Sequence, residues 1–165
     1  MKRKTKALTY GAVIAAMYTV LTLLAFAFGL SGGAIQIRIS EALTILPFFT
    51  PYAIWGLFAG CLISNILTGC ALWDIIFGSI ATLIGALFTY ATGKIKKPFS
   101  KYLAPLGPIV SNTIIIPFIL TYVYGVKEAF GILMLTVGIG EFISAGILGY
   151  VLIFSLEKHK PKLFS

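Results

Sequence analysis

The sequence predicts an all-α integral membrane protein with six transmembrane helices, and three observations support this fold class. Apolar residues make up 59% of the 165 residues and charged residues 11%, whereas soluble domains average roughly 45–50% and about 25%. The mean hydropathy is +1.00, which is too high for a small water-soluble domain to bury in its core. Long apolar runs alternate with short basic clusters, as in membrane proteins. A soluble globular domain and a disordered chain are therefore excluded.

The positive charges are concentrated beside the apolar runs. The net charge is +8, and eleven of the thirteen Lys and Arg residues fall in three clusters: Lys2, Arg3, Lys4 and Lys6; Lys94, Lys96, Lys97 and Lys101; Lys158, Lys160 and Lys162. Clusters of this kind mark the cytoplasmic ends of membrane helices. We therefore expect the basic residues to face the cytoplasm and membrane lipid, with no nucleic acid as a partner.

The first helix is expected over residues 7–29. This run is about 23 residues long, enough to cross about 30 Å of hydrocarbon. Ala25-Phe26-Ala27 has the form of a signal-peptide cleavage site, but the run is much longer than the apolar core of a signal peptide. We interpret it as a membrane helix.

Residues 40–67 are too long and too rich in proline for one helix. Pro47 and Pro51 interrupt the segment, because proline lacks an amide donor and disfavours helical geometry in the residue before it. A break near Thr50 gives a short second helix over 40–49, interrupted by proline, and a third helix over 51–67. A ten-residue α-helix covers only about 15 Å, so irregular backbone before it would complete the crossing, and such backbone lines protein-walled cavities.

Three further helices are expected over 74–92, 103–124 and 129–156. With all three basic clusters in the cytoplasm, an even number of crossings must separate each pair of clusters. Six helices satisfy this condition and place both termini in the cytoplasm. The loops 29–39, 69–73 and 125–128 then face outward, and the whole chain, 1–165, forms a single membrane domain.

Polar side chains within these helices indicate a structural or functional role, because a charge near the bilayer centre costs at least about 2.5–3.5 kcal/mol. Glu141 lies about twelve residues into the last helix, about 18 Å along its axis, and we expect it to bind a ligand or an ion. Arg38 and Glu41 are close enough to share a helix face, either as a structural salt bridge or as ligand contacts. Asn112, near mid-membrane, could bond another helix or the ligand.

Three more polar or aromatic residues are expected near the outer face. Asn65 ends the third helix, and Trp73 and Asp74 begin the fourth. Trp73 suits either the aromatic belt of the membrane interface or stacking on a flat ligand, and Asp74 suits either a helix cap or a ligand contact. With Arg38, Glu41 and Glu141 these residues could line a cavity open to the outside. Carboxylates, one arginine and aromatic rings suit a small planar heterocycle with N–H donors.

The first helix also carries small residues at four-residue spacing. Ala7, Gly11 and Ala15 form one ridge, and Ala12 and Ala16 form a neighbouring one. Small residues let another helix approach closely in lipid. Packing within this chain and packing on a partner protein are both open interpretations.

The sequence offers little for catalysis, metal binding or nucleotide binding. It has two cysteines, Cys61 and Cys70, and one histidine, His159, in the basic tail, which is too few for a zinc site or a histidine-based catalytic pair. No GxxxxGK[ST] motif is present, so ATP-driven work would need another subunit. We expect neither an enzyme nor a bound cofactor.

Four stretches of the sequence carry a recognisable pattern: residues 35–49 (IQIRISEALTILPFF), 60–65 (GCLISN), 74–79 (DIIFGS) and 137–141 (VGIGE). Together they resemble a known family of membrane proteins, the queuosine-precursor transporters. The resemblance implies a substrate-binding S-component of an energy-coupling-factor (ECF) importer, a type of ABC transporter, with six helices and an outward-facing pocket. It implies a 7-deazaguanine substrate, such as the 7-cyano or 7-aminomethyl compound, and a transmembrane T-component and two ATPases as partners. The family's Ala-x-x-x-Ala motif, which packs on the T-component, matches Ala12 and Ala16.

Two other functions stay open from the sequence. S-components share one fold across many vitamins, and a fold does not determine a substrate, so another vitamin or a purine-like base is possible. The other is a self-sufficient, homo-oligomeric transporter that uses Glu141 as a proton or ion site.

Overall fold

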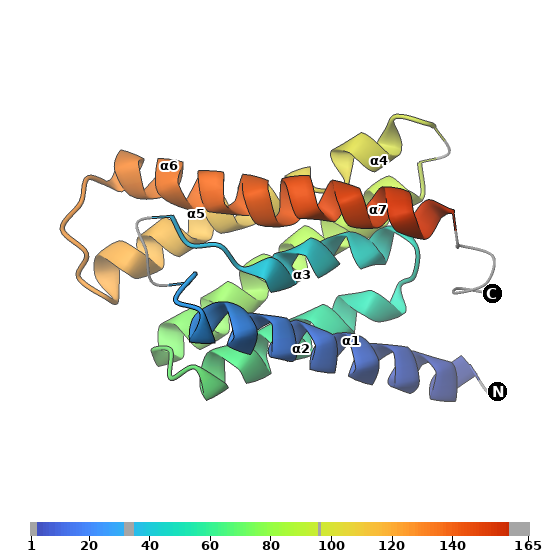
Figure 1. The fold of residues 1–165 in the computed structure, drawn as a ribbon, viewed down its shortest axis with the longest axis horizontal. Coiled ribbons are helices and arrows are strands. Elements are labelled where there is room, and N and C mark those ends of the chain that lie inside the picture. Colours follow the sequence, from blue (N-terminus) through green and yellow to red (C-terminus); the bar gives the residue numbers. More distant parts are fainter. Residues whose placement is uncertain (1–2, 32–34, 96, 159–165) are drawn as a thin grey trace.

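The computed structural model describes residues 3–31, 35–95 and 97–158, which form helices joined by turns and short irregular segments (Figure 1). Four helices in this part of the chain are long and apolar enough to cross a membrane, and two shorter apolar helices accompany them. The long ones are Lys4–Ala27, Leu72–Gly93, Ser100–Tyr122 and Phe130–Glu157, and the short ones are Ile39–Phe48 and Tyr52–Leu67. The all-helical membrane fold predicted from the sequence is confirmed at this level.

The helical elements follow the predicted order. They are α1 (Arg3–Ala27), η1 (Ile39–Phe48), α2 (Tyr52–Leu67), α3 (Leu72–Gly93), α4 (Ser100–Leu103), α5 (Leu106–Tyr122), α6 (Phe130–Glu141), η2 (Phe142–Leu148) and α7 (Gly149–Glu157). The last three form one continuous helix (Figure 1). The predicted break lies between η1 and α2, where Thr50 is not helical.

The short second helix differs in type from the α-helix expected. η1 is a 3₁₀ helix with Pro47 inside it, and its residues from Ser40 to Pro47 are all buried. A 3₁₀ helix rises about 2.0 Å per residue, so ten residues cover about 20 Å rather than the 15 Å assumed for an α-helix. The surrounding helices α1, α2, α3 and α7 and the η2 segment all contact η1, which makes it the central element of the bundle.

Helices α1 and α2 pack with their backbones close together. A Cβ atom on Gly56 would lie 2.7 Å from the carbonyl oxygen of Gly11, and one on Gly60 would lie 2.9 Å from that of Ala15. Both distances are too short for a side chain. One of the two small-residue ridges predicted on the first helix, Gly11 and Ala15, therefore packs inside this protein against two glycines of α2.

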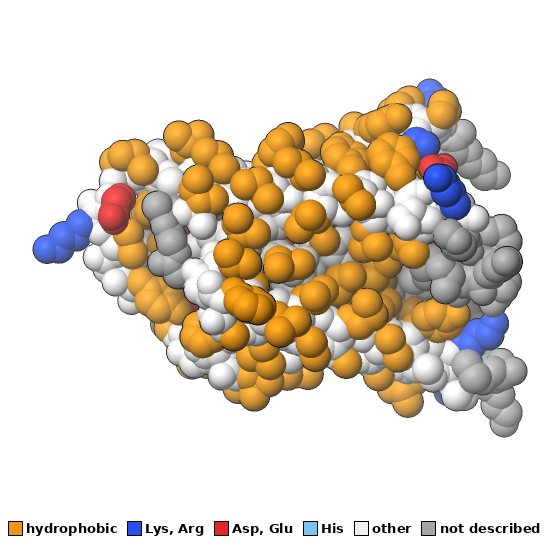
Figure 2. Space-filling view, viewed as in Figure 1, with side chains coloured by type: hydrophobic (Ala, Val, Ile, Leu, Met, Phe, Trp, Pro, Cys, Tyr) orange, Lys and Arg blue, Asp and Glu red, His pale blue; other side chains and the backbone are white. Residues whose placement is uncertain are grey.

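The ends of the bundle differ in charge. The first residue of α1 and the last of α7 lie at the same end, where the α3–α4 connection also lies (Figure 1). Most of the basic side chains visible in Figure 2 gather at this end, while apolar side chains cover the middle of the molecule. The opposite end holds the turns with the positive-φ glycines Gly29, Gly69 and Gly125. This arrangement is what the basic clusters predict, and the assignment of the basic end to the cytoplasm stays a prediction.

Candidate functional site

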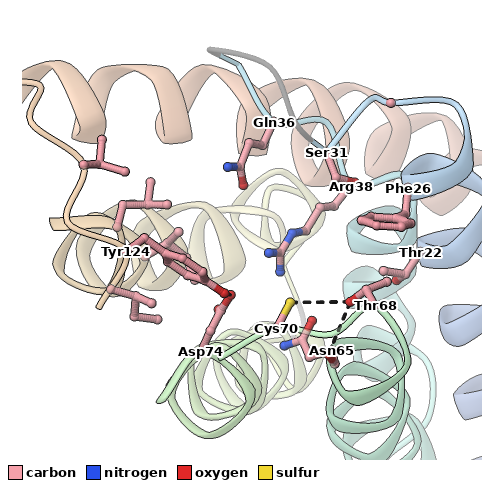
Figure 3. A pocket seen from close by; sticks show the side chains of 15 residues that line it. Thr22, Phe26, Ser31, Gln36, Arg38, Asn65, Thr68, Cys70, Asp74 and Tyr124 are labelled. Atoms are coloured by element: carbon pink, nitrogen blue, oxygen red, sulfur yellow. Dashed lines mark hydrogen bonds between the residues drawn. The ribbon is translucent and has the colours of Figure 1, made fainter. Parts of the chain in front are cut away.

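A cavity of about 460 Å³ lies at the end of the bundle opposite the basic clusters. It is lined by the C-terminal ends of α1, α2 and α5, the N-terminal end of α3 and the segment before η1 (Figure 3). Its size falls within the usual range for small-molecule sites, about 300–1,000 Å³. The polar part of its lining consists of Thr22, Ser31, Gln36, Arg38, Asn65, Thr68, Asp74 and Tyr124.

Arg38 is the residue immediately before η1, and its side chain projects into this cavity (Figure 3). The segment that carries it crosses α6 at Gly140, where a Cβ atom would collide with the carbonyl oxygen of Gln36. Only glycine allows this close approach. The salt bridge between Arg38 and Glu41, one of the two alternatives that the sequence left open, does not form, since the one ion pair within 4 Å among the described residues joins Lys101 to Glu157. The guanidinium of Arg38 is thus available to the cavity.

Asp74 lies in the cavity lining at the first turn of α3 and is 6% exposed. Its Oδ2 accepts a hydrogen bond of 2.9 Å from the hydroxyl of Tyr124, which follows α5. The backbone amide of Ala71 donates to that same hydroxyl oxygen at 3.0 Å. Burial and the nearby Asp74 carboxylate raise the pKa of Tyr124, and the hydrogen bond from the Ala71 amide lowers it. The net result is a pKa of about 12. The hydroxyl is therefore protonated and donating at neutral pH.

Asn65 reaches the cavity from the last turns of α2 and is 2% exposed. Its Nδ2 contacts the sulfur of Cys61 at 3.7 Å, a weak interaction. Gly78 lies beside both Asn65 and Asp74, since a Cβ there would be 3.2 Å from Nδ2 and 3.3 Å from Oδ1. The amide and the carboxylate therefore share a small space that an alanine would narrow.

Glu41 and Glu141 lie deeper, outside the lining of the large cavity. Glu41 is 1% exposed and accepts a hydrogen bond from the hydroxyl of Tyr18 on α1. The side-chain amide of Asn112, on α5, interacts with both carboxyl groups. Each glutamate has one buried oxygen without a hydrogen-bond partner in the described part of the chain. The structure thus brings Glu41, Asn112 and Glu141 together as a buried polar cluster.

Glu141 connects this cluster to the cavity region. It lines a cavity of about 10 Å³ together with Gln36 and Arg38, which also line the large cavity. A space of that size holds about one water molecule. Glu141 ends α6, and the π-helical segment η2 begins at the next residue. Such π-helical turns are frequent at functional sites.

Trp73 lies away from the site formed by its neighbour Asp74. It is 55% exposed and lines a separate apolar groove between α3 and α5, where its ring stacks on Phe77. Consecutive residues of a helix point about 100° apart, so Asp74 faces inward and Trp73 outward. The aromatic rings that line the cavity are instead those of Phe26 and Tyr124 (Figure 3).

Ala12 and Ala16 both lie on the exposed side of α1. Gly11 and Ala15, one position earlier in each case, pack against α2. The structure therefore separates the two small-residue ridges, one inside the protein and one on its surface.

Several cavity residues were not predicted from the sequence. They are Thr22, Phe26, Gln36, Thr68, Cys70 and Tyr124. These residues lie toward helix ends and in turns, where no periodic pattern of apolar residues indicates which side chains face inward. Gln36 falls within the family-like stretch 35–49, which was the one available signal. In the described part of the chain, no group of three or more His, Cys, Asp and Glu side chains is placed to hold a metal ion.

The donors and acceptors of the cavity suit a flat, polar ligand. Arg38 and Asn65 can donate hydrogen bonds to a carbonyl oxygen, and Asp74 can accept them from N–H groups. Phe26 and Tyr124 supply aromatic surface.

The model of the QueT transporter family matches residues 8–158, which cover every helix of the bundle except the first turn of α1. This chain belongs to the QueT transporter family. It is similar to the "Queuosine precursor transporter QueT" of Lactococcus lactis subsp. cremoris (strain MG1363), with 38% identity over 84 residues. That match covers 50% of this chain and 48% of the relative, so the chain spans about half the length of the curated relative it matches. No solved structure matches.

Membership of the QueT transporter family agrees with the fold. A transporter family and several apolar helices long enough to span a membrane identify a multi-pass membrane protein. The family is named for transport rather than for an enzymatic reaction.

Proposed function

We propose that this chain is the substrate-binding S-component of an ECF-type importer and captures a queuosine precursor from outside the cell. The substrate would be a 7-deazaguanine, such as the 7-cyano or the 7-aminomethyl compound. The name of the curated relative and the resemblance of residues 35–49 to queuosine-precursor transporters both support this substrate class.

The observation that carries the proposal is the cavity lined by Arg38, Asp74 and two aromatic rings. A deazaguanine has a ring N–H beside an exocyclic amino group, and a carbonyl next to that ring nitrogen. A carboxylate can accept from the N–H groups, and a guanidinium can donate to the carbonyl. Aromatic rings cover the face of a planar base.

Direct binding to the purified protein in detergent micelles tests the substrate. We expect both 7-deazaguanines and guanine itself to bind more tightly than adenine, which lacks the paired N–H donors and the carbonyl. A site that must hydrogen-bond such groups rejects analogues without them, because its own buried polar groups stay unsatisfied. Equal affinity for adenine, or tighter binding of an unrelated vitamin, would contradict the proposed substrate class.

The energy for uptake would come from partner subunits, a transmembrane T-component and two ATPases. The exposed ridge of Ala12 and Ala16 on α1 supports a helical partner, since small residues allow close helix contact in lipid. Co-purification with these subunits is the expected result. A stable homo-oligomer that transports substrate in liposomes without them would favour the self-sufficient transporter that uses Glu141.

A further inference from the structure

Tyr124 and Asp74 form a hydrogen-bonded unit at the cavity, between the connection after α5 and the first turn of α3. Tyr124 comes from the connection after α5 and Asp74 from the start of α3, and they meet through the bond from the hydroxyl to Oδ2 at 2.9 Å. The Ala71 amide holds the same hydroxyl from the other side at 3.0 Å. The ring of Tyr124 belongs to the cavity lining (Figure 3). The hydroxyl is therefore fixed by two neighbours while the ring borders the cavity.

The second oxygen of Asp74 is not satisfied by the protein. Oδ1 is buried and accepts no hydrogen bond within the described residues. Gly78 places no side chain against it, and a Cβ at that position would lie only 3.3 Å from Oδ1 and crowd it. A buried carboxylate oxygen without a donor is costly, and a donor that enters the cavity would remove this cost.

We propose that Tyr124 is a positioning and specificity residue: it holds Asp74 through Oδ2, so that Oδ1 accepts an N–H group of the ligand while the tyrosine ring covers the ligand's face. This inference rests on the proposed function and makes it more specific. The site selects a planar ligand with an N–H donor at its edge, which is a property of the 7-deazaguanine ring. It also assigns to Tyr124 the stacking role that the sequence left open for Trp73 beside a place in the aromatic belt.

A double-mutant cycle on the purified full-length protein tests the unit, with 7-aminomethyl-7-deazaguanine as the probe. Tyr124→Phe keeps the ring and removes the hydroxyl, and Asp74→Asn removes the charge. Each single variant should bind the probe about tenfold more weakly or worse, as expected when a buried charged hydrogen bond loses a partner. Because the hydroxyl acts through Asp74, the double variant should bind within about twofold of Asp74→Asn alone. Tyr124→Leu, which also removes the ring, should bind more weakly than Tyr124→Phe.

Tyr122→Phe is the matched control. Tyr122 is 79% exposed and lines the apolar groove outside the cavity, so its variant should bind the probe like the wild type. Thermal unfolding of each variant separates loss of binding from loss of the fold. Unchanged affinity in Tyr124→Phe would overturn the inference, and so would a double variant whose loss equals the product of the two single losses. A wild-type protein that binds none of the deazaguanines would overturn the proposed function and this inference with it.

Discussion

The carbonyl oxygen of Gln36 occupies the place where a side chain at position 140 would begin, so α6 admits only glycine there. This contact fixes the segment that carries Gln36 and Arg38 against the helix that carries Glu141. Gly140 thereby allows the segment with Arg38 to pack directly against the helix with Glu141, although Gln36 and Gly140 are about a hundred positions apart in the chain.

Gly140→Ala should lower both stability and ligand binding. The added methyl group must displace the backbone of the segment before η1, because backbone cannot move aside as a flexible side chain can. We expect a destabilisation of about 1–3 kcal/mol and weaker binding through the displaced Arg38. Gly131→Ala is the control in the same helix, since a Cβ there meets nothing within 4 Å. Thermal unfolding and ligand titration check both variants, and a Gly140→Ala protein as stable as Gly131→Ala would contradict the reasoning.

Glu141→Gln should weaken ligand binding at least about tenfold without unfolding the protein. The substitution replaces the carboxyl group that lies beside Arg38 and interacts with Asn112 by an amide, and loss of one partner of a buried charged hydrogen bond costs about 2–5 kcal/mol. Titration of the purified variant with a 7-deazaguanine measures the effect, and circular dichroism checks the fold. Unchanged affinity in both Glu141→Gln and Asp74→Asn would exclude the two carboxylates from ligand recognition.

The orientation in the membrane follows from the positions of the basic clusters. In a background without Cys61 and Cys70, single cysteines at Ser31 and Lys127 should react with membrane-impermeant thiol reagents added outside. Cysteines at Lys97 and Lys158 should react only after the membrane is permeabilised, because Lys-rich ends remain in the cytoplasm. Labelling of position 97 from outside in intact cells would exclude the six-helix topology.

Substitutions on the exposed ridge of α1, at Ala12 and Ala16, should affect transport but not ligand binding. Ala12→Trp and Ala16→Trp should abolish uptake and loosen the complex with the T-component, since an indole keeps a partner helix at a distance. Ligand affinity of the isolated protein should stay unchanged, because neither residue lines the cavity. Uptake assays in cells and pull-down of the partner subunits measure the two effects.

Two substitutions serve as references for these tryptophan variants. Ala15→Trp should unfold the protein, because Ala15 is buried against Gly60. Val151→Trp, at a position of α7 that is 65% exposed, should leave uptake unchanged. Normal uptake in both Ala12→Trp and Ala16→Trp would remove α1 from the coupling surface.

Much of the fold and part of the site could be predicted from the sequence. Segment lengths and basic clusters are set by the thickness of the hydrocarbon layer and by the cost of charge within it. Proline chemistry placed the break at Thr50. The cost of polar groups in lipid singled out Arg38, Asn65 and Asp74, which line the cavity. These arguments concern single residues or single helices, so they need no knowledge of neighbouring helices.

Which face of each helix points inward was decided only by the tertiary structure. Trp73 and Asp74 are adjacent in sequence, yet packing of α3 places the first in an exposed groove and the second in the cavity. Gly11 and Ala15 pack inside while Ala12 and Ala16 remain outside. In a soluble helix the apolar face identifies the buried side, but in lipid both faces are apolar and this signal is lost. Only close packing among helices brings Tyr124 to Asp74 and the carbonyl of Gln36 to Gly140, and no local pattern in the sequence encodes those contacts.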